Sequence, residues 1–195
     1  MCKHFCRMVL VLAAISSSIS LCSGDDNPLV DYRGFAQQVQ EVEAIRAERL
    51  VSEEKFIELM AEKSIVILDA RSESKFAALH VKGAKNLSFP EFTEETLAKI
   101  IPNKETRVLI YCNNNFTNQQ EAFPSKSLRT ALNVHTFNAL YSYGYKNIYE
   151  LKPLLDFEKT SIEFEGPLSK QPVIQECRRG QAITNNLGQS VQARR

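Results

Sequence analysis

The stretch Val108-Leu-Ile-Tyr-Cys112-Asn-Asn-Asn-Phe-Thr117 decides how the chain is interpreted. Its first half is a short apolar run typical of a buried β-strand, and this strand ends on a cysteine. In open α/β sheets, ligands bind at the edge formed by the carboxyl ends of the strands. We therefore expect Cys112 to lie at a ligand-binding edge. Because a cysteine at a strand end is also a common inert core residue, its surroundings must decide between the two interpretations.

The residues after Cys112 are small and polar, which predicts a tight loop around the sulfur. Three consecutive Asn follow it, and Asn tolerates left-handed backbone angles better than most residues. Backbone N–H groups wrapped around the thiol would form an anion cradle that favours thiolate and prepares a nucleophile. The residues expected to form this cradle are Asn113, Asn114, Asn115, Phe116 and Thr117.

Further strands and helices alternate along the chain. The run Ile65-Val-Ile-Leu68 lacks polar alternation, as do strands of parallel sheets that are covered on both faces. A last strand is expected over residues 147–151, and residues 161–165 are a candidate for one more. The expected helices cover about residues 33–48, a segment capped by Ser52, residues 94–100 after Thr93, and residues 127–143. This alternation predicts an α/β domain with a mainly parallel central sheet flanked by helices.

Composition and the first residues bear on partners and location. The net charge of +1, without a basic stripe, argues against a nucleic-acid binder. Residues 1–24 have a basic start, a short apolar run and then small residues, which is typical of a cleavable export signal. That run is too short to span a bilayer, so we expect no transmembrane span in the mature chain. We expect a periplasmic or secreted protein, with lipid attachment at Cys22 as the less favoured alternative.

The cysteine and histidine counts limit the available chemistry. Of five cysteines, only Cys112 and Cys177 are expected to remain in the mature chain after cleavage beyond Cys22. Cys177 lies in a polar tail between Glu176 and Arg178, and pairing of the two thiols for redox sensing is one alternative function. The three histidines do not form a metal site at recognised spacings, and we expect neither a metal nor a cofactor.

Four ordered pieces of the chain resemble the rhodanese-like (sulfurtransferase) family over about residues 49–157. They are Ile65-Val-Ile-Leu-Asp69-Ala-Arg71, His80-Val-Lys-Gly-Ala-Lys-Asn86-Leu87, Val108-Leu-Ile-Tyr-Cys112 and Gly144-Tyr-Lys-Asn-Ile-Tyr-Glu-Leu151. The resemblance implies the three-layer α/β fold of that family. The expected organisation is a signal peptide over 1–24, a helical extension over 25–48, the domain over 49–157 and a partly disordered tail over 158–195.

The resemblance also implies an activity. Cys112 would accept a sulfane sulfur from a small donor such as thiosulfate, hold it as a persulfide, and pass it to a thiol or another thiophilic acceptor. A protein thiol is among the acceptors considered. Asp69 and Arg71 are candidate supporting residues, although a buried ion pair or a helix cap is the more common role of such a pair.

The chain departs from the family in two places. The loop after Cys112 lacks the Arg or Lys that family loops often carry, which argues against phosphate as a substrate. Residues 118–127 delay the helix that usually follows, and this insertion is a candidate lid or partner surface. We hypothesise that Lys126 or Arg129 supplies the missing positive charge and that Phe116 lines an apolar acceptor pocket. The alternative function is a catalytically silent rhodanese-fold binding module that uses the Asn118–Ser127 loop.

Overall fold

The structure, a computed structural model, describes residues 27–169. The expected export signal, Cys22, Cys177 and most of the expected tail lie outside the described residues. The helices are α1 (Tyr32–Ala47), α2 (Glu53–Met60), α3 (Glu73–Ala78), α4 (Glu94–Ile100) and α5 (Leu132–Ser142), with 3₁₀ turns η1 (Phe89–Glu91), η2 (Asn113–Asn115) and η3 (Leu128–Thr130). The strands are β1 (Leu50–Val51), β2 (Ile65–Asp69), β3 (His80–Val81), β4 (Lys85–Asn86), β5 (Arg107–Tyr111), β6 (Phe116–Thr117), β7 (Ile148–Leu151), β8 (Leu155–Asp156) and β9 (Phe164–Glu165).

A five-stranded sheet in the order β1-β7-β5-β2-β4 forms the centre of the fold. All its neighbouring strands are parallel, and β5 lies between β2 and β7. The apolar runs predicted as strands are β2 and β5, and both are buried on their two faces. The predicted fold class, α/β with a mainly parallel sheet flanked by helices, is therefore confirmed.

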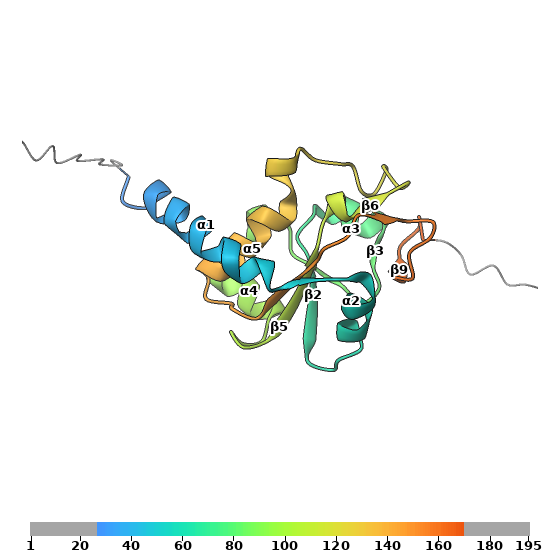
Figure 1. Cartoon of the computed structure of the whole chain (residues 1–195), viewed down its shortest axis with the longest axis horizontal. Coiled ribbons are helices and arrows are strands. Elements are labelled where there is room, and N and C mark those ends of the chain that lie inside the picture. Colours follow the sequence, from blue (N-terminus) through green and yellow to red (C-terminus); the bar gives the residue numbers. More distant parts are fainter. Residues whose placement is uncertain (1–26, 170–195) are drawn as a thin grey trace, which may run out of the picture.

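Helices cover both faces of this sheet. Figure 1 shows α1, α4 and α5 on one side of the strands and α2 on the other. Side chains of β5 alternate accordingly: Val108 and Ile110 pack with α1, α4 and α5, whereas Leu109 and Tyr111 pack with α2. The two-residue period of the strand thus places the residue after Tyr111, which is Cys112, toward the face that α1 and α5 cover.

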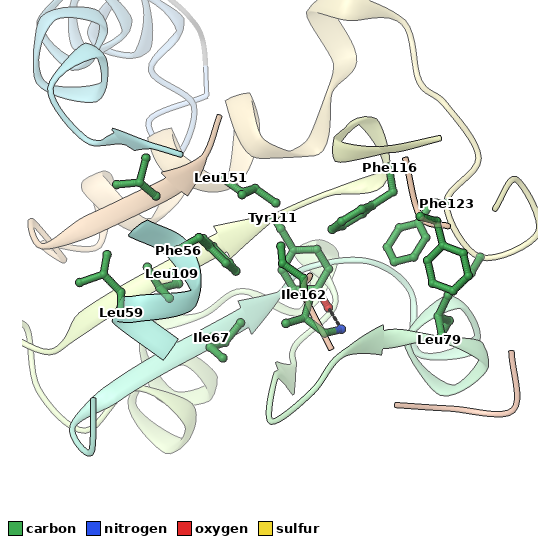
Figure 2. Close-up of a cluster of buried hydrophobic side chains, with 14 residues drawn as sticks. Phe56, Leu59, Ile67, Leu79, Leu109, Tyr111, Phe116, Phe123, Leu151 and Ile162 are labelled. Carbon is green, nitrogen blue, oxygen red and sulfur yellow. Dashed lines mark hydrogen bonds between the residues drawn. The ribbon is translucent and has the colours of Figure 1, made fainter. Parts of the chain in front are cut away.

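The face covered by α2 is continued by an aromatic cluster (Figure 2). Phe116 and Phe123 lie with their ring centroids 4.7 Å apart, and Phe116 also contacts Phe164 edge-on. Phe164 belongs to β9, which pairs antiparallel with β3, and the nearby Ile162 is only 4% exposed. Residues 158–169 therefore pack onto the fold, and a short strand forms within the candidate range 161–165.

Two of the predicted helix starts are confirmed, and a third is wrong. The hydroxyl of Ser52 caps α2, and Thr93 forms a capping box at the start of α4. The helix predicted over residues 127–143 begins only at Leu132, because Ala131 has an extended backbone (φ −56°, ψ 127°) that separates η3 from α5. Among residues 27–169, no helix is both long and apolar enough to cross a bilayer.

Candidate functional site

Cys112 directly follows β5 and is almost fully buried, with 1% of its surface exposed. It nevertheless contributes to the lining of a small surface pocket of about 190 Å³. The other residues that line this pocket are Arg46, Asn114, Asn115, Leu128, Ala131, Asn133, Val134, Glu150, Leu151 and Lys152. Because pockets for drug-sized ligands occupy roughly 300–1,000 Å³, this one is better suited to a small ion or to the end of a larger molecule.

Backbone amides surround the sulfur of Cys112 from two elements. The amide of Asn114, in η2, donates to Sγ at 3.4 Å, and the backbone amides of Asn133 and Leu132, at the start of α5, act to lower the pKa of the thiol. No side chain caps α5, so its first amides are left available to an anion. The inserted residues before α5 therefore do not remove the helix N-terminus from the cysteine.

The pKa of the Cys112 thiol is nevertheless raised above its ordinary value. Burial is the largest cause, because it disfavours the charged thiolate, and the negative charge of Glu150 adds to it. The amides of Asn133, Asn114 and Leu132 oppose this rise without cancelling it. The resting form of Cys112 at neutral pH is accordingly the thiol.

Only one of the five residues expected to form the cradle donates its amide to the sulfur. Asn114 does so, whereas the amide of Asn115 donates to the carbonyl of Cys112 at 3.1 Å. Phe116 and Thr117 form β6, which pairs in parallel with β8. This pairing carries the chain away from Cys112, so the loop does not wrap around it as predicted. Asn113 is buried beside the loop and lines a neighbouring pocket instead.

The hypothesis that Phe116 lines an apolar acceptor pocket is corrected by the structure. Phe116 is fully buried in the aromatic cluster and points toward Phe123 (Figure 2). The pocket at Cys112 is lined instead by polar and charged side chains together with Leu128, Val134 and Leu151. Strand pairing of β6 with β8 fixes the direction of Phe116, because successive side chains of a strand point to opposite faces.

A bidentate ion pair forms one wall of the pocket. Arg46, on α1, donates from Nη2 to Oε1 of Glu150 at 2.5 Å and from Nε to Oε2 at 2.6 Å. Glu150 lies on β7, with its side chain 6% exposed, whereas the side chain of Arg46 is 32% exposed. A buried carboxylate of this kind needs its partner, because an uncompensated buried charge costs several kcal/mol.

Asn133 connects this ion pair to the cysteine loop. Its Nδ2 donates to Oε1 of Glu150 at 3.2 Å and to Oδ1 of Asn115 at 3.1 Å. Oδ1 of Asn115 in turn accepts from the amide of Cys112 at 2.9 Å. These bonds fix the backbone of Cys112 to α5 and β7. Oδ1 of Asn133 is buried without a partner among the described residues.

The two cations expected near Cys112 lie elsewhere. Lys126 lines the neighbouring pocket with Arg71 and Asn113, and Arg129 is exposed in η3. Neither lines the pocket at Cys112. The hypothesis that one of them supplies the missing charge is therefore corrected, and Arg46 and Lys152 are the cations at this pocket. The reason is that Asn114 holds Lys126 by its backbone, which leaves its side chain on the other side of the loop.

Asp69 and Arg71 form a buried ion pair away from the sulfur. Nη2 of Arg71 lies 2.6 Å from Oδ2 of Asp69, and both side chains are about fully buried. Arg71 also donates to the carbonyls of Leu79 and Ala122. These contacts tie β2 to the segment after α3 and to the insertion, which is a structural role. Neither residue lines the pocket at Cys112.

A family model for the rhodanese-like domain matches residues 52–153, which is more than half of the chain. The chain belongs to the rhodanese-like domain family. The match contains Cys112 and Glu150 but begins after α1. Arg46 therefore reaches the pocket of this rhodanese-like domain from outside the matched range.

Solved structures of low sequence identity are similar to this rhodanese-like chain. The rhodanese-like domain of an Anabaena protein is 17% identical, with 75% of this chain and 96% of that one covered and a TM-score of 0.44. A Bacillus halodurans protein is 16% identical over 69% of this chain and 88% of its own, with a TM-score of 0.46. A rhodanese from E. coli solved with anions is 21% identical over 52% and 96%, with a TM-score of 0.34. No curated protein sequence matches this chain.

Sequence reasoning missed Arg46, Asn133, Glu150 and Lys152 as pocket residues. A signal existed for two of them. Glu150 is the acidic residue within an otherwise uncharged strand, and Arg46 follows the buried Val42 by one helical turn. Asn133 gave no such signal, since its position depends on where α5 begins. Within residues 27–169, no group of three or more His, Cys, Asp or Glu side chains is placed to hold a metal ion.

Proposed function

We propose that this rhodanese-like protein is a sulfurtransferase that carries sulfane sulfur as a persulfide on Cys112. The observation that supports it most is the placement of Cys112 in a small pocket that backbone amides of η2 and α5 enter from two sides. Such amides stabilise an anionic sulfur, and a persulfide carries its charge on the outer sulfur. Residues 1–24 support an exported location for this activity.

The transfer has two balanced steps. The Cys112 thiolate attacks the sulfane sulfur of a donor such as thiosulfate, an S–S bond forms, and the donor S–S bond breaks with its electron pair leaving on sulfite. An acceptor thiolate then attacks the outer sulfur of the persulfide and takes it, and the Cys112 thiolate is restored. Because the thiol pKa is raised, the first step begins with loss of the Cys112 proton to solvent.

The test is the intact mass of the protein after exposure to thiosulfate or to a persulfide donor, with Cys112→Ser as the control. The proposal predicts one added sulfur atom on the wild type, removable by cyanide and absent from Cys112→Ser. If neither donor leaves sulfur on Cys112 while the thiol still reacts with an alkylating reagent, the proposal fails.

One observation favours the second candidate function, a catalytically silent binding module that uses the Asn118–Ser127 loop. Cys112 is 1% exposed and its thiol pKa is raised, neither of which prepares a nucleophile for rapid attack. The loop itself presents exposed side chains from Ser125 to Ser127. An unmodified but alkylatable Cys112 in the mass experiment is the result that this second function predicts.

A further inference from the structure

Arg46 is the positively charged residue that the structure adds to the pocket of Cys112 from outside the family domain. It lies in the last turn of α1, six residues before the matched range begins at residue 52. Helix α1 is held against α5 by the bond from Nε2 of Gln38 to the carbonyl of Asn138 and by the Glu41 carboxylate, which accepts from Tyr141. The position of Arg46 is therefore fixed by two helices as well as by Glu150.

The guanidinium of Arg46 has donors left for a ligand. Nε and Nη2 both bind Glu150, and Nη1 has no acceptor among residues 27–169. An Arg side chain has five N–H donors in a fixed plane, so this geometry leaves the two N–H groups of Nη1 free. Since about a third of the side chain is exposed and it lines the pocket, a ligand there can contact it.

Charge in the pocket favours an anion. Its charged side chains are Arg46, Glu150 and Lys152, so cations exceed anions by one. Glu150 is almost fully buried and both of its oxygens already accept hydrogen bonds from Arg46 or Asn133. The carboxylate is therefore directed into the protein, whereas the cation is the member of the pair that reaches solvent.

We propose that Arg46 binds the oxyanion end of the sulfur donor, such as a sulfonate group, and so positions the sulfane sulfur of the donor at Cys112. This inference rests on the proposed function. In the first transfer step the S–S bond of the donor breaks and its electron pair leaves on sulfite, which gains charge. Because an arginine guanidinium can bind two oxygens of one anion through paired N–H donors, Arg46 would stabilise this leaving group. Helix α1 then belongs to the functional unit.

The experiment measures anion binding without sulfur transfer. Sulfate carries no sulfane sulfur, so it serves as the probe: Cys112 is alkylated with neutral iodoacetamide at rising sulfate concentration, with ionic strength held constant by sodium chloride. Each rate is divided by the sulfate-free rate of the same variant, which removes differences in thiol pKa. We expect sulfate to protect wild-type Cys112.

The variants have opposite expected signs. Arg46→Gln should raise the sulfate concentration for half-maximal protection at least about 10-fold, since a charge-assisted bond contributes about 1.5–3 kcal/mol. Glu150→Gln should lower the sulfate concentration for half-maximal protection, because the pocket then loses its negative charge. Arg49→Gln is the matched control: Arg49 lies on the same segment but binds Tyr149, and it should behave as the wild type. Lys152→Gln tests the other cation of the pocket.

Arg46→Gln leaves Glu150 buried without its partner, so a second variant keeps the test valid if the first does not fold. Arg46→Gln/Glu150→Gln removes both charges and leaves no buried ion. Its sulfate protection should be weaker than that of Glu150→Gln, which differs from it only in keeping Arg46, and weaker than that of the wild type. Protection equal to the wild type in either Arg46 variant, or its loss in Lys152→Gln alone, would overturn the inference.

Failure of the inference and failure of the proposed function give different results. If wild-type Cys112 takes up sulfur while Arg46 variants keep the wild-type sulfate protection and the wild-type KM for thiosulfate, only the inference fails. If sulfate protection depends on Arg46 but no donor loads sulfur, the anion site stands and the sulfurtransferase proposal fails. A KM for thiosulfate that is higher in Arg46→Gln than in the wild type, with an unchanged KM for the thiol acceptor, supports both the inference and the sulfurtransferase proposal.

Discussion

The side-chain amide of Asn114 holds the backbone of Lys126 through two hydrogen bonds. Its Nδ2 donates to the Lys126 carbonyl at 2.9 Å, and its Oδ1 accepts from the Lys126 amide at 2.8 Å. The backbone amide of the same Asn114 donates to Sγ of Cys112. One residue thus contacts both the cysteine and the inserted segment (residues 118–127), which is followed directly by Leu128 and Ala131 of the pocket lining.

We expect Asn114→Ala to expose Cys112. The substitution removes both bonds from Asn114 to Lys126 but keeps the backbone amide on the sulfur. The part of the inserted segment near Lys126 then loses its attachment to the cysteine loop. Two hydrogen bonds contribute roughly 1–3 kcal/mol together, and the free energy of unfolding should fall by no more than that. The measurement is the rate at which a bulky maleimide modifies Cys112, compared with a small one.

The control for this prediction is Lys126→Ala. Since Asn114 binds only the backbone of Lys126, this variant retains both bonds and should modify at the wild-type rate. If the ratio of the modification rate with the bulky maleimide to that with the small one is the same in Asn114→Ala and the wild type, the inserted segment does not limit access to Cys112.

The pKa of the Cys112 thiol gives a second prediction. Burial and the charge of Glu150 both raise it, so the alkylation rate should increase with pH through a midpoint above the ordinary value for a free thiol, about 8.5. Glu150→Gln removes one of these causes and should lower the midpoint. The measurement is the iodoacetamide rate from pH 6 to about pH 10 for the two proteins.

The same shift links stability to pH, and its sign can be stated. A thiol whose folded-state pKa is raised keeps its proton up to a higher pH in the native state than in the unfolded state. The native protein is therefore stabilised below the unfolded pKa, and this contribution is lost as pH rises through the folded value. The difference in unfolding free energy between wild type and Cys112→Ala should decrease over that window. A difference that is independent of pH would contradict the raised pKa.

The sequence predicted the framework of the site better than the site itself. Apolar runs placed β2 and β5, and Thr93 placed the start of α4, because these depend on neighbours within one turn or one strand. The position of Cys112 at the end of β5 follows from the same local pattern.

Contacts between distant residues could not be predicted in this way. Arg46 and Glu150 are 104 residues apart, and their pairing depends on how α1 packs against α5 and β7. The expected cradle failed for a similar reason: the pairing of β6 with β8 competes with wrapping around the sulfur, and neither strand is long enough to show a pattern. A loop sequence therefore does not by itself fix which amides face the cysteine.

A fourth prediction concerns the buried pair of Asp69 and Arg71. Arg71→Met should lower the free energy of unfolding by about 3–5 kcal/mol, because it leaves the Asp69 carboxylate buried without a cation. It also removes the donors to the carbonyls of Leu79 and Ala122. Urea denaturation measures the loss.

The comparison for Arg71→Met is an exposed pair. Glu62→Gln breaks the ion pair with Arg107, whose two side chains are both partly exposed, and should cost no more than about 1 kcal/mol. Equal losses in the two variants would show that burial of Asp69 and Arg71 does not determine the contribution of their pair.

The last prediction distinguishes the role of a core residue, Phe116, from that of a pocket residue, Leu128. Phe116 is 0% exposed and contacts Phe123 and Phe164, so Phe116→Ala should cost about 3–5 kcal/mol of unfolding free energy. Leu128 is 87% exposed at the pocket, and Leu128→Ala should leave stability within about 0.5 kcal/mol of the wild type. If Leu128→Ala alters sulfur transfer to an organic thiol while the milder core variant Phe116→Leu does not, acceptor contacts lie at the pocket. The reverse pattern would restore Phe116 as an acceptor-binding residue.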